Sequence, residues 1–236
     1  MGHPPRLCFD GALYHVTARG DNKESVFLDE ADHQQYLMLL RRYKDRFHFT
    51  LHAYALMANH VHLIAEPAVG TTVSQIMQCL TSTYTKYFNR RHGRVGHVFQ
   101  GRFHSRLIEG NIYLLVASRY VHLNPVRANM VRRPAHYPWS SYRAYRHPTA
   151  NPLGLTDPEV VLSLVSPDAR RQREAYCDFV EARREPAPGE HQDTAASLAQ
   201  GIVGSDAFRH HMQARFHLSV RRRGRPPRPT PGKIRV

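Results

Sequence analysis

His60 and His62 are the residues of this chain whose types and spacing most clearly suggest chemistry. They lie in an alternating stretch, His60 to Leu63, that is typical of a β-strand. Successive side chains of a strand point to opposite faces, so both imidazoles share one face while Val61 and Leu63 turn toward a core. Two imidazoles one pleat apart can bind a single divalent cation. The spacing is explained equally well by two polar residues on a solvated sheet face, so it leaves both interpretations open.

Alternation and helix-capping signals predict the elements that must position this pair. Strands are predicted over residues 13–17, 49–57, 60–65 and 98–108, and helices over 29–47, 72–92 and 111–124. The last helix is predicted to end at Asn124, because Pro125 disfavours helical geometry in the residue before it. This order predicts an α+β fold, a ferredoxin-like split βαβ sandwich with a central antiparallel sheet and two helices on one face. The other face is then available for a ligand and for the extra third helix.

Charge is distributed unevenly along the 236 residues, whose formal net charge is +14. The net charge is +10 over residues 1–146, −5 over residues 147–206 and +9 over residues 207–236. Proline-containing, loop-like stretches at 147–152 and 185–189 interrupt the chain. We therefore predict a large basic domain (1–146), a small acidic helical segment (147–206) and a basic, flexible tail (207–236). The basic surplus favours a polyanionic partner.

Cysteine content and hydropathy favour a cytoplasmic protein. The 3 cysteines form no CxxC pair and are odd in number, which argues against a disulfide scaffold. No apolar run approaches the roughly 18 residues that a membrane span needs, and the N-terminal sequence is not typical of a signal peptide. We expect no association with a membrane.

The stretch from Met57 to Leu63 resembles the His-hydrophobic-His motif of the HUH endonucleases. More closely, it resembles the REP-associated tyrosine transposases (RAYT family), single-strand DNA transposases with one catalytic tyrosine. Over residues 10–146 the family's other sequence blocks follow in order: Tyr14–Gly20, Tyr87–Gly93, Gly96–Phe103, Arg119–Ala128 and Tyr137–Tyr142. The resemblance implies a transposase or endonuclease that cleaves and rejoins single-stranded DNA at hairpin-forming repeats through a 5′-phosphotyrosine intermediate.

Spacing alone cannot select a nucleophile among the 12 tyrosines, but the resemblance selects Tyr120, on the third predicted helix. Helical periodicity then places Tyr120 on one stripe with Tyr113, Ala117 and Asn124. The periodicity also predicts that Ile112 and its apolar neighbours anchor the helix and that His122 points to the other side.

The same resemblance implies that His60 and His62 hold Mg²⁺ or Mn²⁺, with Zn²⁺ as an alternative. A phenol is a poor nucleophile near neutral pH, so a cation that polarises the scissile phosphate would assist Tyr120. The third ligand would be the side-chain oxygen of Asn124, one helical turn after Tyr120. The sequence explains Asn124 equally well as a cap before Pro125.

Basic residues near aromatic ones are the predicted DNA contacts, because arginine binds phosphate and aromatic rings stack on unpaired bases. In the large domain these are Lys86, Arg90, Arg91, Arg94, Arg102, Arg106 and Arg119. In the tail, Arg223 and Arg225 belong to an Arg-Gly-Arg-Pro sequence that is similar to an AT-hook. We favour the simpler interpretation, a disordered polybasic tail that attracts DNA non-specifically.

Two other classes of protein account for part of these features. A non-catalytic, structure-selective DNA- or RNA-binding protein on the same scaffold explains the charge but leaves the histidine pair and Tyr120 without a role. A zinc-dependent hydrolase explains the histidines but not the basic surplus. Because relatives often pair their active sites, the resemblance also leaves a homodimer open.

Overall fold

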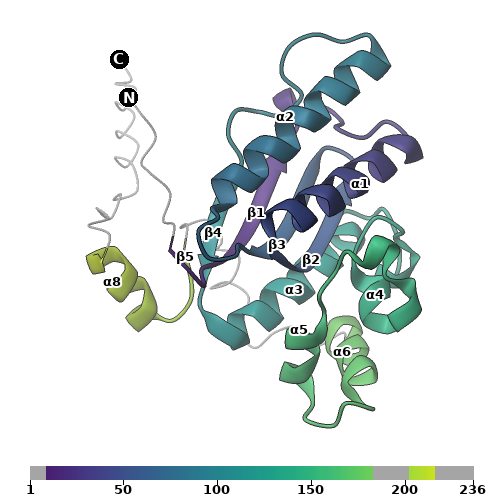
Figure 1. The fold of residues 1–236 in the computed structure, drawn as a ribbon. Coiled ribbons are helices and arrows are strands. Elements are labelled where there is room, and N and C mark those ends of the chain that lie inside the picture. Colours follow the sequence, from purple (N-terminus) through teal and green to yellow (C-terminus); the bar gives the residue numbers. More distant parts are fainter. Residues whose placement is uncertain (1–8, 183–201, 216–236) are drawn as a thin grey trace, which may run out of the picture.

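The computed structural model describes residues 9–182 and 202–215, and an antiparallel sheet lies at its centre (Figure 1). The main strands of this part are β1 (Leu13–Arg19), β2 (Thr50–Met57), β3 (His60–Glu66) and β4 (His104–Ile108). They lie in the order β2-β3-β1-β4, and the short β5 (Ile202–Val203) pairs with β4 in parallel. One helix connects β1 to β2 and another connects β3 to β4, which confirms the predicted ferredoxin-like sandwich.

Helices α1 (Glu30–Phe47) and α2 (Val73–His92) cover one face of the sheet (Figure 1). Both begin at a residue that sequence signals favour as a cap. Asp29 caps α1, while Thr72 and Gln75 form a reciprocal capping box at α2. The core between these helices and the sheet is rich in aromatic side chains and includes Tyr14, Val16, Tyr36, Leu40, Tyr54, Leu63, Leu80, Tyr84 and Phe88.

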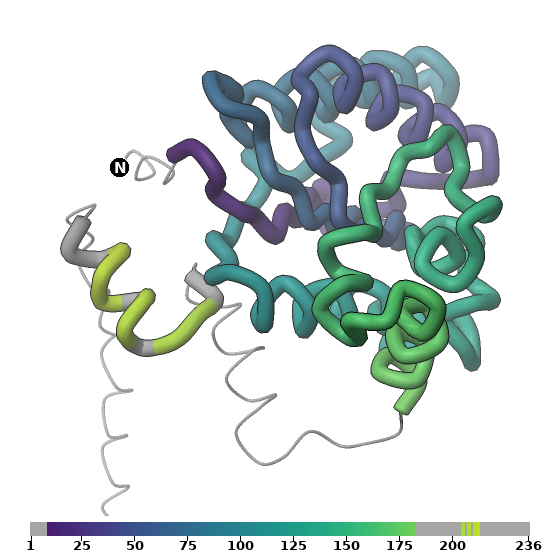
Figure 2. The backbone as a smooth tube through the Cα atoms, turned by 60° about the horizontal axis from the view of Figure 1, so that its bottom comes forward, coloured from purple at the N-terminus to yellow at the C-terminus, as the bar shows by residue number. Residues whose placement is uncertain are grey.

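The opposite face is covered by α3 (Gly110–Arg127), as Figure 2 shows. Helices α4 (Tyr142–Arg146), α5 (Glu159–Val165) and α6 (Gln172–Glu181) pack around α3. On β2 the side chains that face α3 include Ala53 and Ala55, whose small size lets the helix lie close to the sheet. The sheet is therefore buried on both faces. Short 3₁₀ turns connect the elements at Asp21–Lys23, Pro134–His136, Pro148–Ala150 and Pro152–Gly154.

The predicted anchor of α3 is wrong. Ile112 is 76% exposed, whereas Leu114, Ala117 and Val121 are buried. The reason is that α3 packs both on the sheet and on α5 and α6, so its buried surface is wider than a single stripe. Periodicity within α3 alone does not reveal which side faces the sheet.

The predicted end of α3 is also wrong, since the helix continues through Pro125 to Arg127. Proline breaks a helix mainly by removing one N–H donor and crowding the preceding turn. Pro125 lies in the final turn, where little of the helix remains to be disrupted. The N–H of Ala128 still donates to the carbonyl of Asn124 at 2.9 Å, so the turn closes.

The strand predicted over residues 98–108 is regular only from His104 onward. Gly101 adopts the left-handed conformation (φ 59°), which interrupts an extended strand. The preceding residues still follow the end of β1, because Phe99 bridges to Gly20 and the N–H of Gln100 donates to the carbonyl of Arg19 at 2.8 Å. Residues 98–103, here called the β4 approach loop, therefore lie alongside the end of β1.

Helices α5 and α6 come from the predicted acidic segment and share a core with α3 and the sheet, through Val161, Leu162, Tyr176 and Val180. Helix α8 (Asp206–Arg215) follows β5, so the predicted tail begins with a helix. The Glu109 carboxylate accepts from the Ser205 hydroxyl at 3.0 Å and from the Ser205 N–H.

Arg223 and Arg225 lie outside the described residues, and the three-part division of the chain stays a prediction. Among the described residues, no helix combines the length and apolar character needed to cross a membrane.

Candidate active site

Strand β3 begins at His60 and places both predicted metal-binding histidines on the face that α3 covers. In the register with β1, His60 lies opposite Arg19 and His62 lies opposite Thr17. The two rings are nearly perpendicular, at 82°, and their centroids are 4.8 Å apart. His62 is buried and His60 is half-buried, so the pair is accessible from the His60 side.

Tyr120, the predicted nucleophile, lies on α3 directly against this part of the sheet. Its ring centroid is 5.9 Å from that of His62 and 5.9 Å from that of His15, with an edge-on arrangement in both cases. The buried side chains of Ala117 and Val121 hold the same part of α3 on the sheet. The structure thus brings together the strand histidines and the helix tyrosine that the sequence predicts.

His15 is a member of this cluster that the sequence interpretation missed. It is 1% exposed, and its Nε2 lies 2.9 Å from Nδ1 of His62, with the two rings stacked at 5.1 Å. His15 and Thr17 alternate on β1, so both face α3. A predicted pairing of β1 with β3 places a histidine near His62, but the register that selects His15 is visible only in the structure.

The hydrogen bonds of His60 leave it suited to bind a cation. The amide nitrogen of Asn59 donates to the carbonyl of Lys23 at 3.2 Å, which turns the amide oxygen toward His60. That oxygen lies 2.7 Å from His60 Nδ1, so Nδ1 must carry the proton and donate it. The Nε2 lone pair of His60 is then available, an arrangement common among metal-binding histidines.

His62 has two possible tautomers, and only one of them fits a cation. If Nδ1 of His62 donates to Nε2 of His15, Nε2 of His62 keeps its lone pair. The proton of His15 then lies on its Nδ1, a buried atom with no hydrogen-bond partner in the described structure. In that tautomer the two imidazoles fit a divalent cation through their Nε2 atoms, with His15 as the acceptor of the His62 proton.

Asn124, the predicted third ligand, has a defined partner on its own helix. Its side-chain nitrogen donates to the carbonyl of Tyr120 at 3.0 Å, which leaves the side-chain oxygen as an acceptor. In the described part of the chain, no cluster of three or more His, Cys, Asp or Glu residues could hold a metal ion. A cation on the two histidines would therefore need oxygen ligands of another kind. The role of Asn124 as such a ligand stays a prediction.

Burial keeps the imidazoles of this cluster neutral. It lowers the pKa of His60 to about 4, with a smaller contribution from Arg19. It lowers the pKa of His15 to about 3, with a smaller contribution from Arg106. The pKa of His62 is well below its ordinary value through burial and the neighbouring His15 and His60. Neutral imidazole is the form that binds a metal ion, so these shifts favour a cation site at neutral pH.

Two arginines bring positive charge to Tyr120. The guanidinium carbon of Arg127 lies 5.0 Å from the centroid of the Tyr120 ring. Arg106 lies opposite His15 in the pairing of β1 with β4, and burial lowers its pKa. Arg106 is half-buried, and a half-buried cation next to a phenol and neutral imidazoles is suited to hold a phosphate. Arg106 is among the DNA contacts predicted from the sequence, whereas Arg127 is not.

The other predicted DNA contacts fall into two groups. Lys86, Arg90 and Arg102 are exposed. Arg94 instead pairs with Glu24 at 2.6 Å, and Arg119 donates to the carbonyl of Phe179 at 2.8 Å. Arg91 bridges Asp29 and Asp32, at 2.6 Å in both cases. These three arginines thus have structural contacts that the sequence did not predict, and contact with DNA stays a prediction for all of these residues.

Arg90 and Arg91 form a matched pair that separates structural from electrostatic roles. Asp32 is fully buried, so Arg91→Ala removes one charged partner from a buried carboxylate and should lower the free energy of unfolding. Arg90→Ala changes an exposed side chain and should alter that free energy by less than about 0.5 kcal/mol.

Urea unfolding measures both stabilities, and oligonucleotide binding at several salt concentrations gives the electrostatic contribution. We expect Arg90→Ala to lower the salt slope by about one unit. Equal stability of the two variants would contradict the assigned role of Arg91.

His122 is buried on the far side of α3 from Tyr120, in a polar network of its own. Its Nδ1 lies 2.8 Å from the Tyr176 hydroxyl, and its Nε2 lies 2.7 Å from the Ser141 hydroxyl. Ser141 in turn accepts from the N–H of Tyr54 at 2.9 Å. His122 therefore connects α3 to α6 and β2.

This burial predicts that the protein loses stability in mild acid. Burial lowers the pKa of His122 to about 3, whereas an unfolded histidine titrates near 6.5. Below pH 6.5 His122 therefore binds a proton in the unfolded chain, whereas in the folded chain it stays neutral down to about pH 3. His122 should then reduce the free energy of unfolding by up to about 1.4 kcal/mol per pH unit as the pH falls through this range.

Urea unfolding between pH 7 and 5 measures this dependence. His122→Gln, which cannot titrate, should be less stable at pH 7 but show a shallower pH dependence. His136→Gln, at an exposed position, should keep the slope of the unchanged protein. Parallel curves for the unchanged protein and His122→Gln would contradict the prediction.

The comparison with protein families gives this fold a class, that of the IS200-like transposases. Residues 8–124 match the family model described as "Transposase IS200 like". This part of the chain, which contains Tyr120 and both β3 histidines, belongs to the IS200-like transposase family.

A solved structure is also similar, that of a REP-associated tyrosine transposase bound to a REP hairpin. The TM-score is 0.54 at 20% sequence identity, and the match covers 66% of this chain and 94% of that chain. At this identity the similarity concerns the fold. No curated protein matches the sequence.

Proposed function

We propose that this chain is a metal-dependent tyrosine transposase that cleaves and rejoins single-stranded DNA at hairpin-forming repeats. The observation that carries the proposal is the packing of Tyr120 against His62, beside Arg127 and on the sheet face where Arg106 also lies. The IS200-like family supports strand transfer as the reaction. The structure similar in fold, which holds a REP hairpin, supports a hairpin as the substrate.

In the first step, the Tyr120 hydroxyl attacks the phosphorus of the scissile phosphate. A bond forms between the tyrosine oxygen and phosphorus while the bond from phosphorus to the 3′ oxygen breaks. The phenol proton passes to solvent, and the leaving 3′ oxygen takes up a proton. The products are a 5′-phosphotyrosine on Tyr120 and a free 3′-OH.

Rejoining is the reverse reaction with a different strand end. A second 3′-OH attacks the phosphotyrosine, the bond from phosphorus to the tyrosine oxygen breaks, and Tyr120 regains its proton. One phosphodiester replaces another through an ester of similar energy, so strand transfer needs no nucleotide triphosphate.

His60 and His62 would hold Mg²⁺ or Mn²⁺ through their Nε2 atoms, with the Asn124 oxygen as a further ligand. When bound, the cation supplies Lewis-acid polarisation of a non-bridging phosphate oxygen. Arg106 and Arg127 add positive charge around the same phosphate, where negative charge develops during attack. His15 would position His62 by accepting its Nδ1 proton, which leaves Nε2 of His62 for the cation.

A covalent-capture assay tests the proposal. The full chain is incubated with a labelled hairpin oligonucleotide that has single-stranded flanks, in Mn²⁺ or in EDTA, and the products are separated under denaturing conditions. We expect a denaturant-stable protein–DNA adduct in Mn²⁺ and none in EDTA. Tight non-covalent binding of the oligonucleotide without an adduct would instead support the non-catalytic binding protein. If the chain neither binds the oligonucleotide nor forms an adduct, both functions are contradicted.

A further inference from the structure

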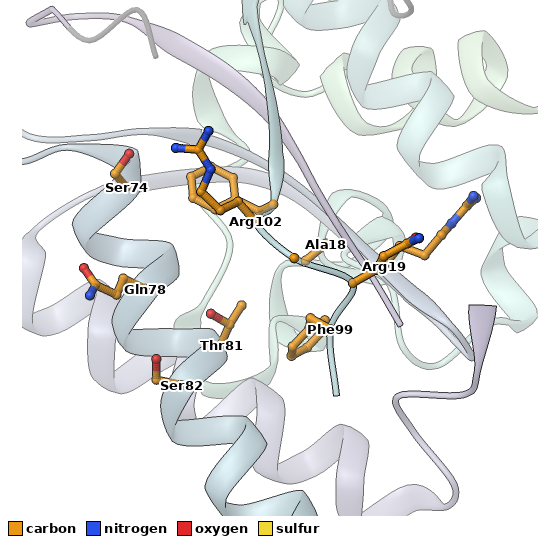
Figure 3. A pocket seen from close by; sticks show the side chains of 11 residues that line it. Ala18, Arg19, Ser74, Gln78, Thr81, Ser82, Phe99 and Arg102 are labelled. Carbon is orange, nitrogen blue, oxygen red and sulfur yellow. The ribbon is translucent and has the colours of Figure 1, made fainter. Parts of the chain in front are cut away.

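We propose that a pocket between α2 and the β4 approach loop binds one unpaired base of the DNA substrate, beside the cleaved phosphate. The inference rests on the proposed function, because it names a subsite for the same substrate. The pocket has a volume of about 380 Å³ (Figure 3). That volume lies within the range of small-molecule sites, which begin near 300 Å³.

The two walls of the pocket differ in chemistry. One wall is a polar face of α2, where Ser74, Gln78 and Ser82 recur every four residues. In Figure 3 these side chains lie one above the other along α2. The facing wall contains the aromatic side chains of Phe99 and Phe103.

This combination suits a nucleobase better than a purely apolar or purely ionic ligand. Unpaired bases are recognised by stacking on aromatic rings and by hydrogen bonds along their edges. Phe99 and Phe103 supply rings, and the Gln78 amide supplies both a donor and an acceptor. The Thr81 hydroxyl donates to the carbonyl of Met77 at 2.7 Å, so its oxygen remains an acceptor toward the pocket.

The charge of the pocket favours an anionic ligand. Among the described residues that line it none is acidic, and the side chain of Arg102 is basic. Arg102 is exposed at the rim, where it can contact a backbone phosphate while the base enters the pocket. A nucleotide within a DNA strand satisfies both the polar and aromatic walls and the basic rim.

The end of β1 connects the pocket with the candidate active site. Ala18 and Arg19 are consecutive on this strand, so their side chains point to opposite faces of the sheet. Ala18 lines the pocket, and in Figure 3 the Arg19 side chain points away from the α2 residues. Arg19 lies opposite His60 in the register with β3. A strand whose cleaved phosphate lies at the histidine pair would therefore have a neighbouring nucleotide within reach of the pocket.

A binding cycle with abasic DNA tests the subsite. The full chain carries Tyr120→Phe to prevent cleavage, and the oligonucleotide carries one abasic residue, moved stepwise through the single-stranded flank. With intact pocket residues, we expect one position at which the abasic residue weakens binding about tenfold, because stacking of one base is lost. Gln78→Ala and Phe103→Leu should each weaken binding of intact DNA about tenfold. At that one position, the abasic residue should cause little further loss of affinity in either variant, because the contact with the base is already lost.

Two controls make the result specific. Phe103→Leu keeps an apolar side chain in the partly buried position and removes only the ring, so the fold is preserved. Gln34→Ala, on the exposed surface of α1, should leave both binding and the abasic profile unchanged. The subsite is contradicted if no abasic position weakens binding. It is also contradicted if the loss of affinity caused by the substitution and that caused by the abasic residue multiply independently at every position.

The same measurements separate this inference from the proposed function. Failure of Mn²⁺-dependent adduct formation by the unchanged chain rejects the transposase chemistry, whatever the abasic profile. Adduct formation with a flat abasic profile keeps the transposase and rejects the base pocket.

Discussion

Tyr120→Phe should eliminate the covalent DNA adduct while the protein still folds and binds DNA. The substitution removes one hydroxyl and keeps the ring that contacts His15, His62 and Arg127, so the packing of α3 on the sheet is maintained. Loss of a nucleophile reduces turnover by orders of magnitude, and we expect the adduct yield to fall at least about 10³-fold. Denaturing gels measure the adduct, and fluorescence anisotropy should show DNA affinity within about twofold of the unchanged protein.

Tyr113→Phe is the matched control, because Tyr113 lies two turns earlier on the same helix. It should retain the adduct. If Tyr120→Phe forms the adduct at the unchanged rate, the nucleophile is another residue. If both variants lose it equally, the effect comes from α3 as a whole rather than from the Tyr120 hydroxyl.

The fold was predictable where a pattern is local. Alternation identifies β3, because successive side chains from His60 to Leu63 point to opposite faces. Asp29 and Thr72 mark the starts of α1 and α2, because their side chains accept hydrogen bonds from the first turn of each helix. The order of these elements then leaves few arrangements of the sheet, and the ferredoxin-like order is the one observed.

What could not be predicted depends on contacts between distant segments. The burial pattern of α3 follows from α5 and α6, which come later in the chain, at Glu159–Val165 and Gln172–Glu181, and pack on it from a second side. His122 is buried for this reason, because its ring contacts Tyr176 of α6, whereas the apolar Ile112 is exposed.

The candidate site shows the same division. His60, His62 and Tyr120 were found from a motif and a resemblance, and the structure places Tyr120 against His62. His15 and Arg127 could not be found in that way, because their relevance lies in a 2.9 Å contact to His62 and a 5.0 Å approach to the Tyr120 ring.

The predicted DNA contacts show the same limit, because the sequence does not reveal which arginines pair with acidic side chains of the protein. Composition shows that Arg91 is basic but not that Asp29 and Asp32 occupy its guanidinium.

The histidine pair gives the second large expected effect. His60→Ala should lower the rate of adduct formation at least about 100-fold in Mg²⁺ or Mn²⁺, because one of two imidazole ligands is lost. His60 is half-buried and begins its strand, so its removal should disturb the fold less than loss of the buried His62. Titration with Mn²⁺, followed by its electron paramagnetic resonance signal, should show at least tenfold weaker binding to the DNA-free protein.

The exposed His136 provides the control, since His136→Ala should change neither quantity. The two readouts also decide between the possible roles of the pair. Unchanged Mn²⁺ binding together with a lost adduct would make His60 a phosphate contact rather than a metal ligand. Unchanged values of both would mean that the face shared by His60 and His62 serves only to pack against Tyr120. Only a parallel loss of cation binding and of adduct formation is consistent with two imidazoles that hold the cation used in cleavage.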